Sequence, residues 1–312
     1  MSSNSPPLAP VEPDVVRSRT VSDSFGTVSV PTGVLWGAQT ARSLQFFAIG
    51  QQRMPVDIIH ALAWIKWASA CVNSDLQLQD PLKARAIASA AERVASGEFD
   101  AEFPLSVWQT GSGTQSNMNV NEVIATLASR ALGQGAGGGK SVHPNDDVNL
   151  GQSSNDVFPS AMHIAVALHV RQSLLPALEE LRAALAVKAK AFASVVKIGR
   201  THLQDATPVT LGQELGGYGA QLALCQESLQ FALGAVHTLA MGGTAVGTGL
   251  NTHPEFGARV CAALATRLGL PLRQADNLFA AMAGHEALVA FHASLKMLAL
   301  ALIKIANDIR LM

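Results

Sequence analysis

Apolar residues recur at helical spacing through most of the chain after residue 55, and polar clusters separate one apolar stretch from the next. An apolar face that returns every three or four residues is typical of an amphipathic helix. The spacing predicts helices over 56–76, 81–96, 110–132, 156–194, 210–239, 258–268 and from about 276 onward. Loose alternation at 25–35, with Pro31 and Gly33, predicts one short hairpin. The pattern therefore predicts a mainly all-α fold.

The stretch at 142–159, VHPNDDVNLGQSSNDVFP, is a polar opening onto a long, almost uncharged helix. Ser153, Ser154 and Asn155 are favoured helix N-cap residues, and Pro159 suits a first turn because it needs no amide donor there. The free amides and positive dipole of a helix start also favour a carboxylate or phosphate. Capping is the ordinary role of such residues, so capping and anion binding both stay open.

Two further polar segments stand at predicted helix ends. TGSGTQSNMNVNE begins at Thr110, and GRTHLQDATP at 199–208 is predicted as a loop between two long helices. The helix between Asn155 and Gly199, with a kink expected at Pro176, would be roughly 50–60 Å long. Its two polar ends cannot touch one small molecule. If both serve one site, a second copy of the chain must complete it.

The composition favours an assembly of several subunits. Charged residues make up 14% of the chain and hydrophobic residues 48%, whereas an average soluble protein has roughly 25% charged residues. We therefore expect apolar surface to be buried between subunits of a helix bundle. The formal net charge of -1 gives no indication of a nucleic-acid or membrane partner.

The cysteines and the ends of the chain complete the expected organisation. Cys71, Cys225 and Cys261 lack CxxC spacing, so we expect no disulfide framework or zinc site and a soluble protein of the reducing cytoplasm. We expect a disordered tail at 1–16, an N-terminal domain at 17–150 and a long-helix domain at 151–312. The helical pattern continues to Met312, which predicts that the sequence belongs to a longer protein.

Two other site types are disfavoured by spacing. GQGAGGGKS at 133–141 resembles a phosphate-binding loop, but Gln134 stands where its first glycine should be and no strand precedes it. His143 with Asp146 and Asp147 could suggest a metal, but a second histidine at ligand spacing is missing from the sequence around them.

Six ordered motifs carry a resemblance to a known family. They read LWGAQTARSL, TGSGTQSNMNVNE, HPNDDVN, SSNDVFP, GRTHLQDATPVTLGQE and GGTAVGTGLNTHPEFG. Together they make the chain, from Asp23 onward, resemble the class II fumarases of the aspartase/fumarase superfamily. The residues at two positions are similar to those of fumarases, namely His202, which follows Thr201, and Ser154, which precedes Asn155. Aspartases typically have Gln in place of His202 and Thr in place of Ser154.

The resemblance implies reversible hydration of fumarate to L-malate by a homotetramer with a long-helix bundle, without metal or organic cofactor. It also implies a smaller, mostly helical N-terminal domain. Carried over by position, the groups that bind the substrate carboxylates would be Ser112, Thr114, Ser153, Ser154, Asn155 and Thr201. His202 from another subunit would act with a bound water as the acid. A secondary anion site would comprise Lys140, His143, Asn145 and Asp146.

The resemblance also implies a missing part. The family's base is a serine on a GSSIMPGKVNP loop, which does not occur in this sequence and would follow Met312. We therefore expect this chain to be inactive alone. Two alternatives are a superfamily lyase that releases ammonia from aspartate and a non-catalytic helical assembly module.

Overall fold

The computed structural model describes residues 17–133 and 142–312, so the predicted tail at 1–16 and most of the glycine-rich segment, including Lys140, lie outside the described residues. The main helices are α1 (Ala38–Phe46), α2 (Val56–Asp75), α3 (Pro81–Ala95), α4 (Thr114–Ala131), α5 (Ser154–His169), α6 (Leu175–Ala191), α7 (Leu211–Val236), α8 (Phe256–Leu268), α9 (Leu278–Ala283) and α10 (Glu286–Leu311). Shorter helical turns are η1 (Asp100–Glu102), η2 (Pro144–Val148) and η3 (Val170–Leu174). The strands are β1 (Ser18–Asp23), β2 (Gly26–Pro31), β3 (Val196–Thr201), β4 (Gln204–Thr210), β5 (Thr238–Leu239) and β6 (Arg273–Gln274).

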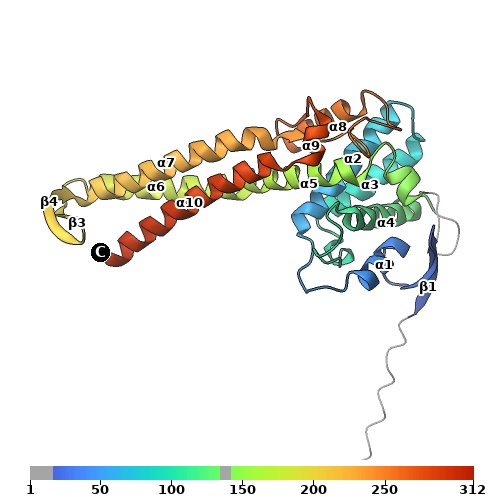
Figure 1. The fold of residues 1–312 in the computed structure, drawn as a ribbon, viewed down its shortest axis with the longest axis horizontal. Helices are drawn as coiled ribbons and strands as arrows, with labels where there is room; N and C mark the ends of the chain where they lie inside the picture. The colour runs from blue at the N-terminus through green and yellow to red at the C-terminus, as the bar shows by residue number, and fades with distance from the viewer. Residues whose placement is uncertain (1–16, 134–141) are drawn as a thin grey trace, which may run out of the picture.

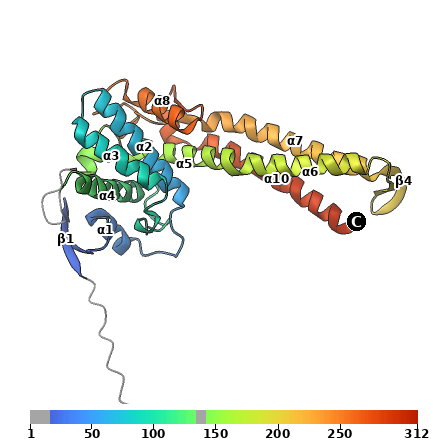
Figure 2. The same ribbon diagram turned by 180° about the vertical axis from the view of Figure 1, so that it is seen from behind.

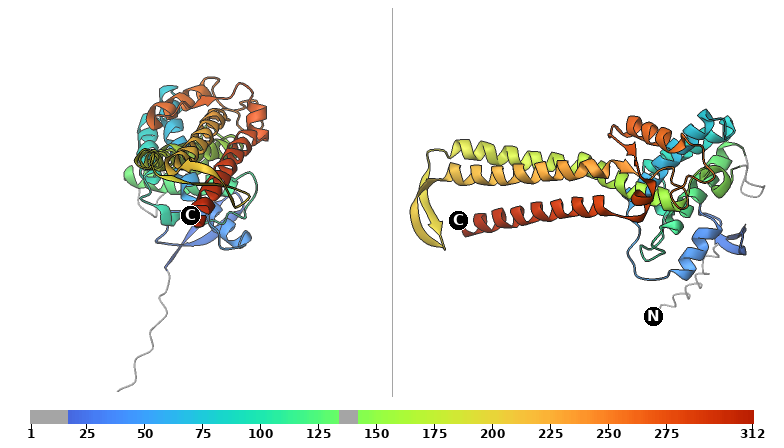
Figure 3. Two further views of the ribbon diagram at one scale, coloured as in Figure 1. Left: turned by 90° about the vertical axis from the view of Figure 1, so that its left-hand side faces the viewer. Right: turned by 45° about the horizontal axis from the view of Figure 1, so that its top comes forward.

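The molecule consists of a helical body and a long helical arm. Figure 1 and the reverse view in Figure 2 show α6, α7 and α10 extending away from a body that contains α1 to α4 and α8. The β3–β4 hairpin lies at the far tip of the arm in Figure 1, and the right-hand view of Figure 3 shows the same arrangement. The predicted mainly all-α fold is confirmed.

The core of the body is built around α2. Its side chains at Ile59, Leu62 and Ile65 are almost fully buried, and the helix packs against α3, α5 and α8. Asp80 caps α3: its side chain accepts a hydrogen bond from Lys83 N, and Pro81 lies in the first turn. The helix α8 belongs to the second half of the chain yet contacts α2, while the predicted domain boundary near residue 150 stays a prediction.

The segment predicted as a loop at 199–208 is instead a β-hairpin. Strands β3 and β4 pair antiparallel with a register shift between Ile198 and Arg200. A Cβ on Gly199 would lie 2.7 Å from Thr207 O, so the close approach of the two strands requires glycine there. The loop prediction was wrong because this pairing depends on contacts across the turn rather than on a typical Asn-Gly turn sequence.

Two predicted long helices are interrupted. In the first, η3 is a wider helical turn that ends just before Pro176 at the start of α6. Proline clashes with the carbonyl four residues earlier, and a wider turn accommodates that clash. The helix expected from about residue 276 is split into α9 and α10 at Gly284.

Much of the apolar surface of α10 is not covered by the rest of the chain. By length and composition the helix could cross a membrane, and 22% of the relevant stretch is buried. Leu300 and Ile303 are more than half exposed. Lys304 and Asp308 form an ion pair on the same helix. The surface is thus apolar with charged positions at intervals, as expected for a helix that packs against other helices.

Candidate active site

The amino terminus of α4 carries the first group of predicted site residues. Gly113 caps the helix with a positive φ of 68°, and a Cβ there would lie 2.3 Å from the Phe158 ring. Only glycine meets both requirements. The hydroxyl of Ser112 lies 3.1 Å from that of Thr110 and 3.1 Å from that of Thr114. The sharp turn therefore gathers hydroxyl groups at the helix start.

The amino terminus of α5 carries the second group. Ser153 caps the helix, and its backbone N–H donates to Asp156 in a reciprocal capping box. The predicted capping role of Ser153 is therefore confirmed. Asn155 is exposed, and its side-chain amide donates to Ala245 O at 2.8 Å. This contact holds Asn155 against the glycine-rich turn after α7.

The two helix starts meet. The Asn117 side chain on α4 donates to Ser154 Oγ at 3.0 Å, and Ser112 and Asn155 line one cavity of about 520 Å³. The fold therefore brings together Ser112, Thr114, Ser153, Ser154 and Asn155, which we call the helix-start cluster. Two positive helix ends with hydroxyl and amide groups form a suitable place for a carboxylate.

A buried layer beneath this cluster was missed by the sequence reasoning. Asp156 is fully buried and accepts backbone hydrogen bonds from Ser153, Gly242 and Thr244 at 2.9 to 3.1 Å. Burial raises the pKa of Asp156 to about 6, against the opposing effect of these donors. Lys66 of α2 is also fully buried, which lowers its pKa to about 7. A lysine in the middle of the apolar run IIHALAWIKWASA was the available signal.

Thr201 and His202 lie at the opposite end of the arm. The strand register pairs Thr201 with Gln204, so His202 and Leu203 form a two-residue turn. Both have positive φ, 52° and 59°, which is uncommon for side chains of this size. Thr201 and His202 are exposed at this tip. Such strained conformations persist where the surroundings impose them, often at functional sites.

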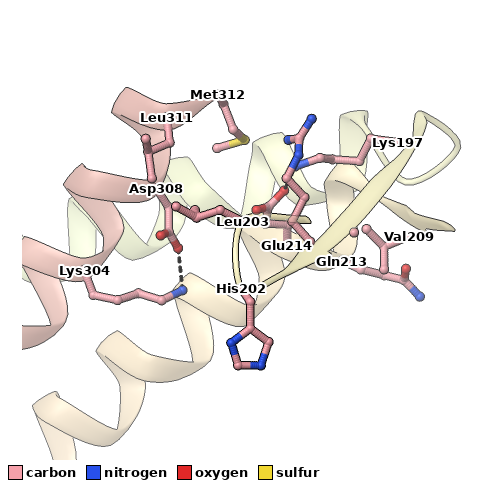
Figure 4. A pocket seen from close by; sticks show the side chains of 12 residues that line it. Lys197, His202, Leu203, Val209, Gln213, Glu214, Lys304, Asp308, Leu311 and Met312 are labelled. Atoms are coloured by element: carbon pink, nitrogen blue, oxygen red, sulfur yellow. Dashed lines mark hydrogen bonds and ion pairs between the residues drawn. The ribbon is translucent and has the colours of Figure 1, made fainter. Parts of the chain in front are cut away.

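His202 borders a second cavity, of about 660 Å³, between the hairpin and the end of α10. Figure 4 shows its imidazole below the hairpin, apart from the Lys304–Asp308 ion pair on α10. Lys197 on β3 pairs with Glu214 on α7, which ties the hairpin to the arm. The hairpin is therefore anchored at its base, while its tip presents His202 to the outside.

One chain does not bring the two ends together. The continuous run of α5, η3 and α6 spans Ser154 to Ala191, which at about 1.5 Å per residue is roughly 55 Å. The helix-start cluster therefore lies far from Thr201 and His202. The predicted site residues form two groups at opposite ends of a rigid element.

The predicted secondary anion residues lie on the surface turn η2. His143 Nδ1 is 3.2 Å from an Asp146 carboxylate oxygen, and Asn145 donates to Asp146 at 3.2 Å. All three side chains are exposed. Among residues 17–133 and 142–312, there is no group of three or more His, Cys, Asp or Glu side chains placed to hold a metal ion.

Comparison with known proteins places the chain in a family. A profile of the lyase family matches residues 26–312. The chain is 62% identical to a class II fumarate hydratase of Chromobacterium violaceum over 95% of its own length and 64% of that protein. It is 58% identical to the class II enzyme of Methylorubrum extorquens over 98% of its length and 65% of that protein.

Solved structures agree with the sequence relatives. The crystal structure of class II fumarase from Schistosoma mansoni superimposes with a TM-score of 0.92 at 43% identity, covering 94% of this chain and 64% of that one. The chain thus spans about two thirds of the length of the relatives that it matches. With this fold and these relatives, the chain belongs to the lyase family, and within that family it resembles the class II fumarate hydratases.

Proposed function

We propose that this chain provides the substrate-binding and acid elements of a fumarate hydratase, a hydro-lyase that interconverts fumarate and L-malate. The observation that carries the proposal is the meeting of two helix starts at the Asn117–Ser154 hydrogen bond. In this arrangement, Ser112, Thr114, Ser153, Ser154 and Asn155 would bind the substrate carboxylates.

The chemistry suits these residue types. Removal of the malate proton beside a carboxylate places a second negative charge on that carboxylate. Hydroxyl, amide and backbone donors that are already oriented stabilise this charge because they need no reorganisation in the transition state. Since the donors are neutral, they do not titrate near neutral pH.

Thr201 and His202 would complete the site from another copy of the chain. The imidazolium form of a histidine can protonate the departing hydroxyl, directly or through a bound water. The separation of about 55 Å within one chain supports a shared site, because no single copy can supply both ends. We also propose that the chain assembles as a homotetramer, because the resemblance to the class II fumarases implies one and because the arm exposes apolar side chains.

We assign the catalytic base to the serine of the GSSIMPGKVNP loop, which does not occur in this sequence. We therefore expect the 312-residue chain alone to be inactive. We further propose a soluble enzyme of the cytoplasm that serves the tricarboxylic acid cycle. His143, Asn145 and Asp146, with Lys140, would form an anion site at the outer approach to the pocket.

The test is a fumarate hydration assay on two proteins. One is the 312-residue chain, and the other is this chain extended with the portion of the Chromobacterium violaceum relative that it does not match. We expect the extended protein to consume fumarate and produce L-malate, with no loss of activity after treatment with EDTA. Ammonia release from aspartate instead of hydration would favour the ammonia-lyase alternative. Equal turnover by the short chain would contradict the requirement for the missing portion.

A further inference from the structure

Lys66 is a buried cation whose position calls for an explanation. It lies in the middle of α2 with no exposed surface, and its Nζ donates to Asn149 Oδ1 at 2.8 Å and to Gln152 Oε1 at 2.9 Å. Among the residues that the structure describes, the hydrogen-bond partners of this amine are amide oxygens and not carboxylates, although the charge of Asp156 acts on it through space. A buried ammonium that lacks an ion-pair partner is costly, so a packing role alone does not account for it.

The two acceptors of Lys66 lie in the turn that leads directly into α5. Asn149 donates from its side chain to Gln152 O at 3.2 Å, and Gln152 donates from its side chain to Val148 O at 3.1 Å. The backbone of Gln152 donates in turn to Asn149 O at 3.0 Å. The ammonium therefore connects the two ends of a closed four-residue turn, immediately before Ser153.

The same acceptor connects Lys66 to the helix-start cluster. Asn149 Oδ1 accepts from Lys66 and also from Asn117 Nδ2 at 3.2 Å. Asn117 Nδ2 donates as well to Ser154 Oγ at 3.0 Å. Since the Ser154 oxygen already accepts this bond, its own O–H hydrogen is left to donate to a further acceptor. A continuous chain of hydrogen bonds thus runs from the buried charge to a predicted substrate-binding hydroxyl.

We propose that Lys66 is a positioning residue of the helix-start cluster, which fixes Ser153, Ser154 and Asn155 through Asn149 and Gln152. The proposal rests on the proposed function, because it assigns to Lys66 the placement of carboxylate-binding groups. A charged donor forms stronger hydrogen bonds than a neutral donor does. It also strengthens the further hydrogen bonds of the network to which it belongs. In its protonated form, the Lys66 amine also places a positive charge beneath the pocket, where a dicarboxylate would bind.

The first test uses the 312-residue chain and needs no activity. In Lys66→Met the stem is kept and the charged donor is removed. We expect hydrogen exchange of the backbone amides at 149–155 to become about tenfold faster, because the turn loses its central donor. Exchange at the β3–β4 hairpin should not change. Ser69→Ala is the matched control, since Ser69 is buried on the same helix and its hydroxyl has no partner among the described residues.

The second test measures catalysis in the extended protein. We expect Lys66→Met to raise the KM for fumarate by at least about tenfold with a smaller change in kcat, since the groups it positions bind the substrate carboxylates. Asn149→Ala should have a similar effect and tests the same route if the lysine variant does not fold. If Lys66 acts through Asn149, the double variant should have a KM within about twofold of Asn149→Ala alone.

The outcomes of these tests distinguish the positioning role of Lys66 from the proposed hydration of fumarate. Unchanged exchange at 149–155 in Lys66→Met, or an unchanged KM, overturns the positioning role. A fully additive double variant also overturns it, because Lys66 would then act by another route. An extended wild-type protein that does not hydrate fumarate refutes the proposed function, while the exchange experiment still decides whether Lys66 orders the cluster.

Discussion

Two ionisable residues with displaced pKa values lie beneath the helix-start cluster. Burial lowers the pKa of Lys66 to about 7 and raises that of Asp156 to about 6. Both groups are bonded to backbone or side chains that lead into Ser153 and Ser154. The geometry of the predicted carboxylate-binding residues is therefore coupled to two buried ionisable groups.

The Lys66 pKa predicts how stability depends on pH. Between about 7 and the ordinary lysine value of 10.5, the folded protein has lost this proton while the unfolded chain retains it. Stability should therefore rise with pH in this window, by at most about 1.4 kcal/mol per pH unit from this group. Asp156, with a pKa of about 6, is ionised throughout and adds no slope.

Urea unfolding of the wild-type chain and of Lys66→Met across this window checks the prediction. The wild-type free energy of unfolding should increase with pH relative to that of the variant, since other titrating groups are common to both. Parallel curves would mean that Lys66 remains protonated in the folded protein.

At the residue scale, the parts of the site that depend on local chemistry were predictable. Ser153, Ser154 and Asn155 precede an apolar helix, and helix-start chemistry is readable from the sequence alone. The acceptors of Lys66 lie more than eighty positions away in the chain. No local pattern reveals such a partner, so the buried layer required the three-dimensional structure.

At the scale of elements, the difference between local signals and contacts distant in sequence explains why the sequence did not predict α1. The cap residue of α1, Gly37, offers no side-chain acceptor. The carboxylate of Glu122 on α4 replaces it, accepting from the backbone N–H groups of Gly37 and Gln39 at 2.8 Å and from Thr40 N at 3.1 Å. The start signal for α1 is thus a tertiary contact from a buried glutamate on another helix.

The exposed apolar side chains of the arm predict an assembly surface. Phe231 on α7 is 90% exposed and Leu224 is 63% exposed, and Leu300 and Ile303 on α10 are similar to Leu224. Apolar side chains gathered on long helices are expected to pack against another copy. We expect Phe231→Glu to shift the extended protein to smaller oligomers, because the charge would be buried without a partner.

Sedimentation velocity or light scattering measures the change. Gln230→Glu is the control, since it adds the same charge at an exposed neighbouring position. An unchanged assembly in Phe231→Glu would place the subunit contact on another face of the arm.

At the scale of the whole molecule, the arm separates the two groups of predicted site residues. The helix-start cluster lies in the body and His202 at the arm tip, roughly 55 Å away by helix length. The length of the helix was predictable from periodicity, whereas the need for a second copy stays a prediction. The hairpin that presents His202 was not, because its turn residues are His and Leu rather than the usual Asn and Gly.

The most direct test of a shared site is subunit complementation in the extended protein. Ser154→Ala and His202→Asn should each reduce hydration strongly, since each removes one end of every site. When the two variants are unfolded together and refolded as mixed oligomers, about a quarter of the sites should combine an intact Ser154 from one copy with an intact His202 from another. We predict recovery of a corresponding share of wild-type activity. Mixed oligomers that form but remain as inactive as either variant would contradict a site built from opposite ends of two chains.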